Sequence, residues 1–529
     1  MRGVVCGAAA LTAVACSGPI ERPERTDKTR LVRVNFDEIR ALDPHKISVV
    51  SDSNVAADQF QGLTDLGPDA KPIPGQAKAW RVSDDGLRWT FELRGGLMWS
   101  DGTPITADDF VYSFRRIINP ATASPYANLL MLIEGAPEIL NGAAAPDTLG
   151  VFAEGPRTVV IQLTAPQPVF PEVVAIAALV PVPKHVIDMH GDAWSRPENI
   201  VSNGAFTMQS WQRQAQMVLK KNPRFIDADT VALETLIYLP ISDEMTAVRR
   251  FRAGEVDIVP TFPDQMGPVL KEQLGTQVRV TVNQATYYYV FHTQKPPFDN
   301  PAVRRALSMA VDRQPLVDSI LRSGYRKALA MVPPDTGFYG APSQPDWATW
   351  TIEERRTEAA KLLARTGITP QTPLDIEIRI NTSDTHQRIA LAIAQMWQPL
   401  GINVSLFNTE AAVHFADLRK GNFKLARAGW VADYNAVDNF LFIFLSDNEG
   451  LNYARYNSPR YDALVTQGQA ASDTTQRMDF MRQAEAQLLA DSPIIPLFYY
   501  VSKKLVASDI DGWSDNLRDR HRSRWFRFK

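Results

Sequence analysis

Hydrophobic and polar residues alternate along an early stretch of the chain, on both sides of a short turn. Apolar side chains stand at every second position near Trp80 and again from Leu87 to Leu93, and Asp85-Gly86 separates the two runs. A period of two is typical of a strand with one buried face, and Asp-Gly is a frequent hairpin turn. The pattern therefore predicts an antiparallel hairpin.

Two later stretches predict strand–helix–strand units, because a period of two gives way to a helical period and then returns. The first unit has a strand at Thr235–Leu239, a helix at Met245–Ala253 with Ser242 as its N-cap and Gly254 after its end, and a strand at Val256–Val259. The second has a strand at Leu374–Ile380, a helix at Thr385–Trp397 and a strand at Ile402–Phe407. Such units imply parallel strands joined by right-handed crossovers.

Two helix starts carry recognisable caps. Thr106 with Asp109 three residues later resembles a capping box, and Asn300-Pro301 combines an N-cap with a first-turn proline. Together these elements predict an α/β protein with both antiparallel and parallel strands.

The first residues resemble an export signal. Gly3–Ala15 is uncharged, Cys16 follows small residues, and a charged, proline-containing run begins near Glu21. We expect a signal peptide with a lipoprotein cleavage box at 1–16, lipidation of Cys16 and a tether at 17–30. A soluble periplasmic product and an uncleaved apolar start are the alternatives.

Composition narrows the class of protein. The 529 residues are 45% hydrophobic and 22% charged, as in ordinary globular proteins, and no stretch after the leader is apolar enough to span a membrane. Fifty-six Lys+Arg against 59 Asp+Glu gives a net charge of -3, so nucleic acid is not an expected partner.

Signatures of enzymes are absent. The only cysteines are Cys6 and Cys16, and the common serine-hydrolase, zinc-protease, nucleotide and dinucleotide motifs do not occur. His185 and His190 are five residues apart and cannot share a helix face, so we expect surface residues rather than metal ligands. We expect no catalytic residues, no metal site and no cofactor.

Two charges stand within an apolar segment near the C-terminal third of the chain. In Phe423–Asn435, Arg427 and Asp433 flank Gly429 and Trp430. One interpretation is an internal Arg427–Asp433 ion pair with Trp430 in the core. The other is a site for a zwitterionic ligand, with its ammonium on Asp433, its carboxylate near Arg427 and its backbone close to Gly429.

An aromatic run, Thr286–Phe291, has two interpretations as well. It could line a pocket, or it could be a strand with one face in the core.

At Phe423–Asn435, and over nearly all of the chain after the tether, the sequence strongly resembles the oligopeptide-binding proteins of ABC importers. These are extracytoplasmic solute-binding proteins of family 5. The stretches that carry the resemblance are Leu42–Ile47, Trp99–Pro104, Thr122–Ala127, Ser202–Ala205, Tyr238–Ile241, Tyr287–Tyr289, Gln294–Phe298, Asn381–Asp384 and Ala426–Asn435. Each is weak alone, but their order and spacing are specific.

The resemblance implies an α/β, two-lobed periplasmic-binding-protein (type II) fold with an additional inserted domain and the ligand enclosed between the lobes. The implied regions are lobe I at 31–61, 181–284 and 500–529, inserted domain II at 62–180, and lobe III at 285–499, with crossings near Ala285 and Tyr500.

The resemblance also implies the ligand site. Asp433 matches the aspartate that binds the peptide ammonium, and Arg427 and His386 match residues that meet ligand carboxylates. Backbone pairing with the peptide is expected near Val50 and Gly429. The full set of expected ligand-binding residues is Asp433, Arg427, Gly429, Trp430, Tyr434, His386, Tyr126, Tyr288, Ser48 and Val50.

Three positions depart from the family pattern: Ala411 stands where Trp is usual, Leu418 where Arg is usual and Val290 where Glu is usual. These departures predict altered side-chain pockets or a different peptide length. The expected function is a receptor that captures oligopeptides by lobe closure and delivers them to an ABC importer permease, without catalysis and as a monomer.

Alternatives remain at this stage. The same fold could bind a cell-wall peptide, a dipeptide, a metal complex or a sugar. An exported hydrolase, or a chaperone or signalling receptor that uses the same cleft, is the alternative from another class.

Overall fold

The computed structural model describes residues 22–23 and 25–529. The predicted signal peptide, the lipidation at Cys16 and the first part of the tether lie outside these residues. Where the tether is described, it contacts the folded protein: Nε of Arg22 donates to the carbonyl of Phe251 (3.0 Å), and Arg25 pairs with Asp509 (3.1 Å).

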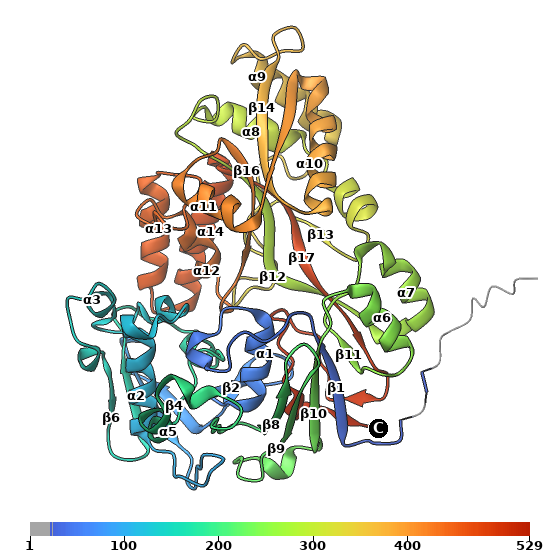
Figure 1. Ribbon diagram of the computed structural model, residues 1–529. Helices are drawn as coiled ribbons and strands as arrows, with labels where there is room; N and C mark the ends of the chain where they lie inside the picture. Colours follow the sequence, from blue (N-terminus) through green and yellow to red (C-terminus); the bar gives the residue numbers. More distant parts are fainter. Residues whose placement is uncertain (1–21, 24) are drawn as a thin grey trace, which may run out of the picture.

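One mixed sheet of eleven strands runs through the length of the molecule (Figure 1). Ten of its strands are, in order, β15 (Ile402–Thr409), β14 (Leu374–Asn381), β16 (Leu425–Val431), β12 (Val278–Phe291), β17 (Ile494–Val506), β11 (Ile258–Val259), β1 (Arg30–Asn35), β10 (Thr235–Pro240), β9 (Gln216–Lys221) and β8 (Phe206–Gln212). The eleventh, β13 (Arg326–Lys327), pairs with β17.

The long strands β12 and β17 connect the two ends of this sheet. Residues 278–282 of β12 pair with 501–505 of β17, and residues 286–290 pair with 494–499. Between these ladders, three residues of β12 (283–285) lie opposite the single residue Tyr500. The predicted lobe crossings near Ala285 and Tyr500 fall on this irregularity, which supports them, although the domain boundaries stay a prediction.

Both predicted strand–helix–strand units are confirmed. Strands β10 and β11 lie parallel to β1 on either side of it, with α6 (Glu244–Arg252) between them in sequence, and β14 and β15 are parallel and joined through α10 (Asp384–Trp397). The N-cap predicted for α6 is wrong by one residue. Asp243, rather than Ser242, accepts a hydrogen bond from the Thr246 amide (2.8 Å). Adjacent Ser and Asp are both good caps, so only the backbone path distinguishes them.

The predicted early hairpin is confirmed and belongs to a separate sheet of four antiparallel strands. Its order is β4 (Ala77–Val82), β5 (Arg88–Leu93), β7 (Thr158–Gln162) and β6 (Val151–Ala153). Helix α2 (Ala107–Ile118) covers this sheet and begins with the predicted capping box, in which the Thr106 amide donates to Asp109 (2.8 Å). A short hairpin of β2 (Thr64–Leu66) and β3 (Pro72–Pro74) precedes β4 in the sequence.

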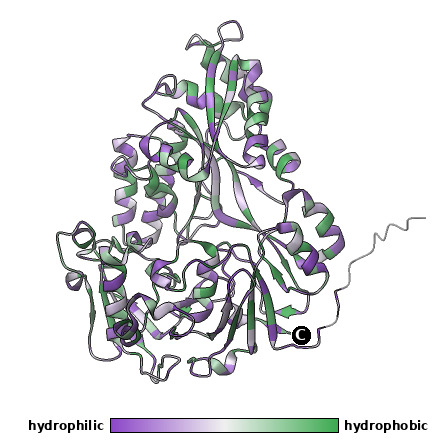
Figure 2. Cartoon of the chain, in the orientation of Figure 1, coloured by the Kyte–Doolittle hydropathy of each residue, from purple (hydrophilic) through white to green (hydrophobic). Residues whose placement is uncertain are grey.

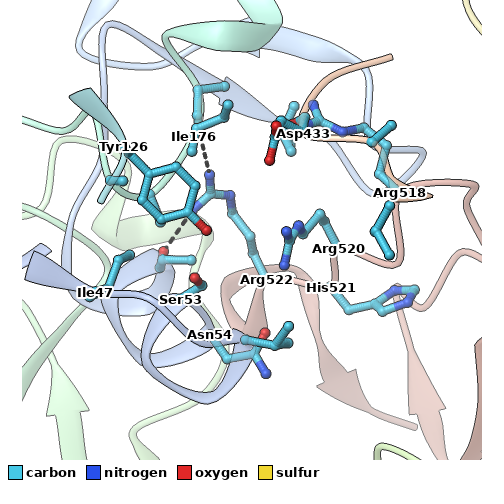
Figure 3. A pocket seen from close by; sticks show the side chains of 18 residues that line it. Ile47, Ser53, Asn54, Tyr126, Ile176, Asp433, Arg518, Arg520, His521 and Arg522 are labelled. Carbon is cyan, nitrogen blue, oxygen red and sulfur yellow. Dashed lines mark hydrogen bonds between the residues drawn. The ribbon is translucent and has the colours of Figure 1, made fainter. Parts of the chain in front are cut away.

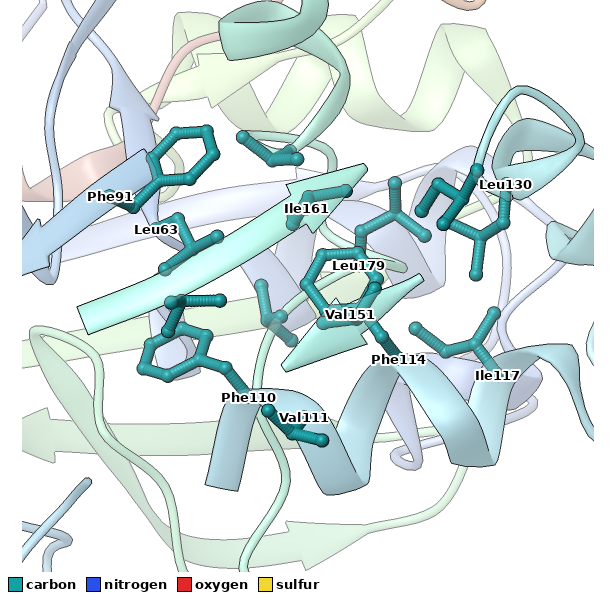
Figure 4. Close-up of a cluster of buried hydrophobic side chains, with 14 of the residues drawn as sticks. Leu63, Phe91, Phe110, Val111, Phe114, Ile117, Leu130, Val151, Ile161 and Leu179 are labelled. Atoms are coloured by element: carbon teal, nitrogen blue, oxygen red, sulfur yellow. The ribbon is translucent and has the colours of Figure 1, made fainter. Parts of the chain in front are cut away.

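The core of this region is aliphatic and aromatic. Phe110, Phe114 and Ile117 project from one face of α2 against Val151 and Ile161 of the sheet (Figure 4). Both hydrophobic and hydrophilic residues occur on the helices, as Figure 2 shows, because the longer helices bury one face and expose the other.

The remaining helices either flank the main sheet or pack into the core of the inserted region. They are α1 (Val50–Gln59), α3 (Ala136–Leu140), α4 (Phe170–Val173), α5 (Lys184–His190), α7 (Gly267–Leu274), α8 (Pro301–Ala310), α9 (Ile352–Ala364), α11 (Ala411–Lys420), α12 (Asp438–Leu441), α13 (Pro459–Ala470) and α14 (Thr474–Asp491). Helix α8 begins as predicted, with the Asn300 side chain accepting from the Ala302 amide (2.9 Å).

A buried carboxylate fastens the C-terminal segment to the hairpin of β2 and β3. Asp65 pairs with Arg522 (2.5 Å) and Arg524 (2.7 Å), and all three side chains are buried. Burial alone would raise the pKa of Asp65, but the two guanidinium groups outweigh it and hold this pKa below its ordinary value. The ionised pair network is therefore part of the folded state.

We expect Asp65→Asn to lower the free energy of unfolding by about 3–5 kcal/mol, because it removes the only carboxylate paired with Arg522 among the described residues and leaves Arg524 with Asp227 alone, at 3.6 Å. Chemical denaturation at pH 7 measures this loss. In the wild type the same contribution is present above the ordinary pKa of an aspartate and is lost as the pH falls through the lowered pKa. The exposed Asp84→Asn serves as the control, with a change within about 0.5 kcal/mol. Equal stability of the two variants would contradict the assignment.

Candidate functional site

A cavity of about 220 Å³ lies where all three predicted regions meet (Figure 3). Val50 and Asn54 of α1 form part of its wall, and Tyr126 and Ile176 of the inserted region face them. The other walls come from the turn after β16 and from the C-terminal segment, which contribute Asp433, Arg518, Arg520, His521 and Arg522. Val50, Tyr126 and Asp433 are thus the predicted site residues that the structure brings together here.

The backbone of Asp433 is held on both sides. Its amide donates to the Asn439 side chain (3.2 Å), and its carbonyl accepts from Nη2 of Arg518 (2.8 Å). Its carboxylate, in contrast, makes no hydrogen bond and no ion pair with any residue in the described part of the chain, and it points into the cavity in Figure 3.

The surroundings of Asp433 favour a cationic partner. Burial raises the pKa of this carboxyl, and the nearby Arg520 and Arg518 offset the shift only in part. A partly desolvated carboxylate without a hydrogen-bond donor is incompletely satisfied, so a ligand cation in the cavity would gain a strong charge-assisted interaction.

The interpretation of Arg427 and Asp433 as an internal ion pair is wrong. Nη2 of Arg427 donates to the hydroxyl of Tyr500 (2.7 Å), and Nη1 donates to the side-chain oxygen of Asn381 (3.1 Å). The guanidinium also lies over the ring of Tyr287, 4.9 Å from its centroid. Arg427 is buried in this polar group and does not line the 220 Å³ cavity.

His386 belongs to the same polar group as Arg427. Its Nδ1 lies 3.2 Å from the Tyr287 hydroxyl. Burial, followed by the charges of Arg427 and His414, lowers the pKa of His386 to about 3. The imidazole is therefore neutral at physiological pH and can meet a ligand only as a hydrogen-bonding group.

Gly429 lies beside this group, on a partly open strand. A Cβ at this position would be 3.2 Å from the Tyr500 hydroxyl and 3.5 Å from Nη2 of Arg427, so the absence of a side chain leaves room for their hydrogen bond. Strand β16 pairs with β12 along its whole length but with β14 only at Leu425 and Ala426. The edge from 427 to 431 is thus unpaired among the described strands.

Backbone pairing near Val50 is more restricted than the sequence implies. Helix α1 begins at Val50, and the extended backbone ends at Val49. Ser48 is exposed just before this helix, and Val50 is 63% exposed beside the cavity. Only the residues before Val50 have the conformation that a strand addition requires.

Three predicted aromatic residues lie away from the cavity. Tyr288 is 2% exposed in the core. Nε1 of Trp430 donates to Asn439 (3.1 Å), and the Tyr434 hydroxyl donates to Asp438 (3.2 Å). The run from Thr286 to Phe291 is a strand, and both of its faces are buried.

The three departures from the family pattern also lie outside the cavity. Val290 and Leu418 are fully buried in the same hydrophobic cluster, and Ala411 is exposed at the start of α11. The first two positions therefore extend the core rather than change a side-chain pocket of this cavity.

The arginines of the C-terminal segment were not among the residues expected at the site. Arg518, Arg520, Arg522 and Arg524 occupy every second position, and the first three line the cavity. The run of arginines at alternate positions was the available signal, although the segment is not a strand: Asp519 has a positive φ of 53°, and a 3-10 helix begins at Ser523.

Glu172 of α4 connects segments that form different walls of the cavity. One of its oxygens accepts from the amide of Asn435 (3.2 Å) and pairs with Nη1 of Arg518 (3.4 Å). The inserted region, the segment after β16 and the C-terminal segment are thereby connected through one carboxylate.

The described residues contain neither a membrane-spanning helix nor a cluster of metal ligands. None of their helices combines the length and apolar character that a bilayer span requires. No group of three or more His, Cys, Asp or Glu side chains among them is arranged to hold a metal ion.

Comparison with known proteins agrees with this architecture. The chain is 39% identical over 517 residues to the periplasmic oligopeptide-binding protein OppA of Salmonella typhimurium, covering 97% of this chain and 94% of that protein. The structure of Haemophilus influenzae OppA in complex with RPPGFSPFR superposes with a TM-score of 0.80 at 34% identity, covering 95% of this chain and 99% of the other. The Escherichia coli murein tripeptide binding protein MppA superposes with a TM-score of 0.81 at 35% identity, covering 95% and 99%.

The family comparison gives the same result over most of the chain. Residues 71–452 match the family described as bacterial extracellular solute-binding proteins, family 5 middle. With its two lobes, its inserted region and the cavity between them, the chain belongs to the family 5 bacterial extracellular solute-binding proteins.

Proposed function

We propose that this protein is a receptor that captures oligopeptides between its lobes and delivers them to the permease of an ABC importer. The observation that carries the proposal is the carboxylate of Asp433, which faces the cavity without a partner among the described residues. An ammonium group is common to peptide N-termini, and it is the cation that this carboxylate would bind. The names of the OppA relatives and the peptide in the H. influenzae complex support the ligand class.

The unpaired edge of β16 provides the second element of the site. A peptide in extended conformation would form main-chain hydrogen bonds with residues 428–431, as an added strand, because the carbonyl of Arg427 is already bonded to Nε2 of His414 (2.9 Å). Because every peptide has the same main chain, such bonds would accept many sequences.

The polar group around Arg427 and His386 would bind a ligand carboxylate. Arg427 supplies the positive charge, and the neutral His386 supplies a hydrogen bond. Gly429, Trp430, Tyr434, Tyr126, Tyr288, Ser48 and Val50 keep their proposed places around the ligand, either in direct contact or as support for the residues that contact it.

The proposal also covers the location of the protein, its attachment to the membrane and its oligomeric state. The receptor is periplasmic or otherwise extracytoplasmic, is tethered through lipidated Cys16, works as a monomer and catalyses no reaction. The domain limits given above are part of this proposal.

A receptor for a cell-wall peptide is the second candidate, and the similarity to the E. coli murein tripeptide binding protein favours it.

Ligands that co-purify with the protein test the proposal directly. Native mass spectrometry followed by denaturing extraction and sequencing should find short peptides, and murein peptides among them would favour the second candidate. A single non-peptide solute would contradict both.

We expect Asp433→Asn to weaken peptide binding by roughly 2–5 kcal/mol, because the ligand ammonium would lose its counter-charge in a desolvated site. Titration calorimetry with a tripeptide measures the change after co-purified ligand has been removed. The control is Asp447→Asn, which changes an exposed carboxylate away from the cavity and should leave the affinity unaltered. Unchanged affinity in Asp433→Asn would show that the ammonium binds elsewhere.

Peptide affinity should also fall as the pH is lowered. The ammonium binds the ionised form of Asp433, so affinity is complete above the pKa of this carboxyl in the free protein and decreases by up to tenfold per pH unit below it. Since burial raises this pKa, the decrease begins at a higher pH than an exposed aspartate would give. Calorimetry across pH 4–7 measures the profile, and a matching profile in Asp433→Asn would rule out Asp433 as its origin.

A further inference from the structure

The C-terminal segment brings three arginines to the cavity, and two of them are neutralised by the protein. Arg518 pairs with Glu172 (3.4 Å) and donates to the carbonyl of Asp433 (2.8 Å). Arg522 pairs with Asp65 (2.5 Å) and donates to two backbone carbonyls. These two guanidinium groups are therefore satisfied without a ligand.

Arg520 differs from its two neighbours. Its amide donates to the side chain of Asn516 (3.1 Å), but its guanidinium makes no hydrogen bond and no ion pair with any residue of the described chain. It points into the cavity beside His521, as Figure 3 shows. A guanidinium offers five N–H donors in a planar fork that matches a carboxylate.

The cavity thus contains one open negative charge and one open positive charge. The side chains of Asp433 and Arg520 both line it, yet no ion pair within 4.0 Å joins them. An ammonium bound to Asp433 would be repelled by the positive charge of Arg520, and it would leave the guanidinium of Arg520 without a hydrogen-bond acceptor. A ligand that carries an anionic group near its ammonium would satisfy both side chains.

We propose that Arg520 makes this receptor selective for peptides that carry a carboxylate within their first two residues, such as Asp or Glu at position one or two. This inference rests on the proposed peptide-binding function and deepens it. Asp433 accepts hydrogen bonds from the terminal ammonium, and Arg520 donates hydrogen bonds to the acidic side chain that lies next to it.

The test compares closely matched peptides on the full-length protein after removal of co-purified ligand. Titration calorimetry is performed with Glu-Ala-Ala, Ala-Glu-Ala and their isosteres Gln-Ala-Ala and Ala-Gln-Ala. We expect at least one acidic peptide to bind roughly 10- to 100-fold more tightly than its Gln isostere, as befits a hydrogen-bonded charge pair.

Variants of Arg520 then assign the preference to this side chain. Arg520→Gln should abolish the difference between acidic and neutral peptides while leaving neutral peptides bound, and Arg520→Lys should retain part of it. The control is Arg460→Gln, which changes an exposed arginine on α13 and should leave the preference intact. Thermal melting of each variant establishes that it is folded.

The outcomes separate this inference from the proposed function. Equal affinity of the wild type for Glu and Gln peptides would overturn the selectivity while leaving peptide binding in place. An equal loss of all four peptides in folded Arg520→Gln would also overturn it, since Arg520 would then be structural. If none of the four peptides binds the wild type, the peptide-binding function itself fails.

Discussion

The antiparallel pairing of β12 with β17 is the interaction on which the cavity depends. Strand β12 supports β16, and the chain leaves β16 directly toward Asp433. Strand β17 leads into the C-terminal segment that carries Arg518 and Arg520. The two adjacent walls that carry Asp433 and the arginines are therefore attached to the same pair of strands. The irregular pairing opposite Tyr500 interrupts this ladder at its middle, and such irregularities allow strands to bend.

The charges around the cavity are neutralised by carboxylates that are distant in sequence. Asp65 compensates Arg522 and Arg524, and Glu172 compensates Arg518 while it also accepts from the amide of Asn435. Unpaired buried charges are strongly destabilising, so these pairs are what permits several arginines to approach one small space. Among the described charged residues that line the cavity, only Asp433 and Arg520 have side chains without a charged partner in the protein.

Local patterns in the sequence predicted several separate elements of the fold. The hairpin of β4 and β5, the unit of β14, α10 and β15, and the caps of α2 and α8 depend on residues that are close in sequence, and periodicity and cap residues reveal such features. The family resemblance supplied the two lobes and the position of Asp433. The N-cap of α6 was misplaced by one residue because two suitable caps stand side by side.

Other parts of the site could not be predicted because they depend on contacts that are remote in sequence. Tyr288 lies in a strand buried on both faces, so an aromatic run does not distinguish a pocket from a core. The partner of Arg427 is Tyr500, which is 73 residues away. Arg520 lies in an irregular segment, and only the folded chain reveals that its neighbours have partners while its own guanidinium has none among the described residues.

This architecture allows one receptor both to bind many peptide sequences and to prefer some of them, because different groups would provide the broad binding and the preference. Main-chain pairing along β16 and the binding of an ammonium use features that all peptides share. The unpaired guanidinium of Arg520 provides selectivity through differences in affinity. It raises the affinity for a ligand with a carboxylate near its ammonium, and it lowers the affinity for a ligand with a second positive charge there. A neutral peptide would leave Arg520 to water in the cavity, so it would bind less tightly without being excluded. The selectivity that follows is graded, and it resides at the ammonium end of the ligand, where the main chain alone cannot distinguish one peptide from another.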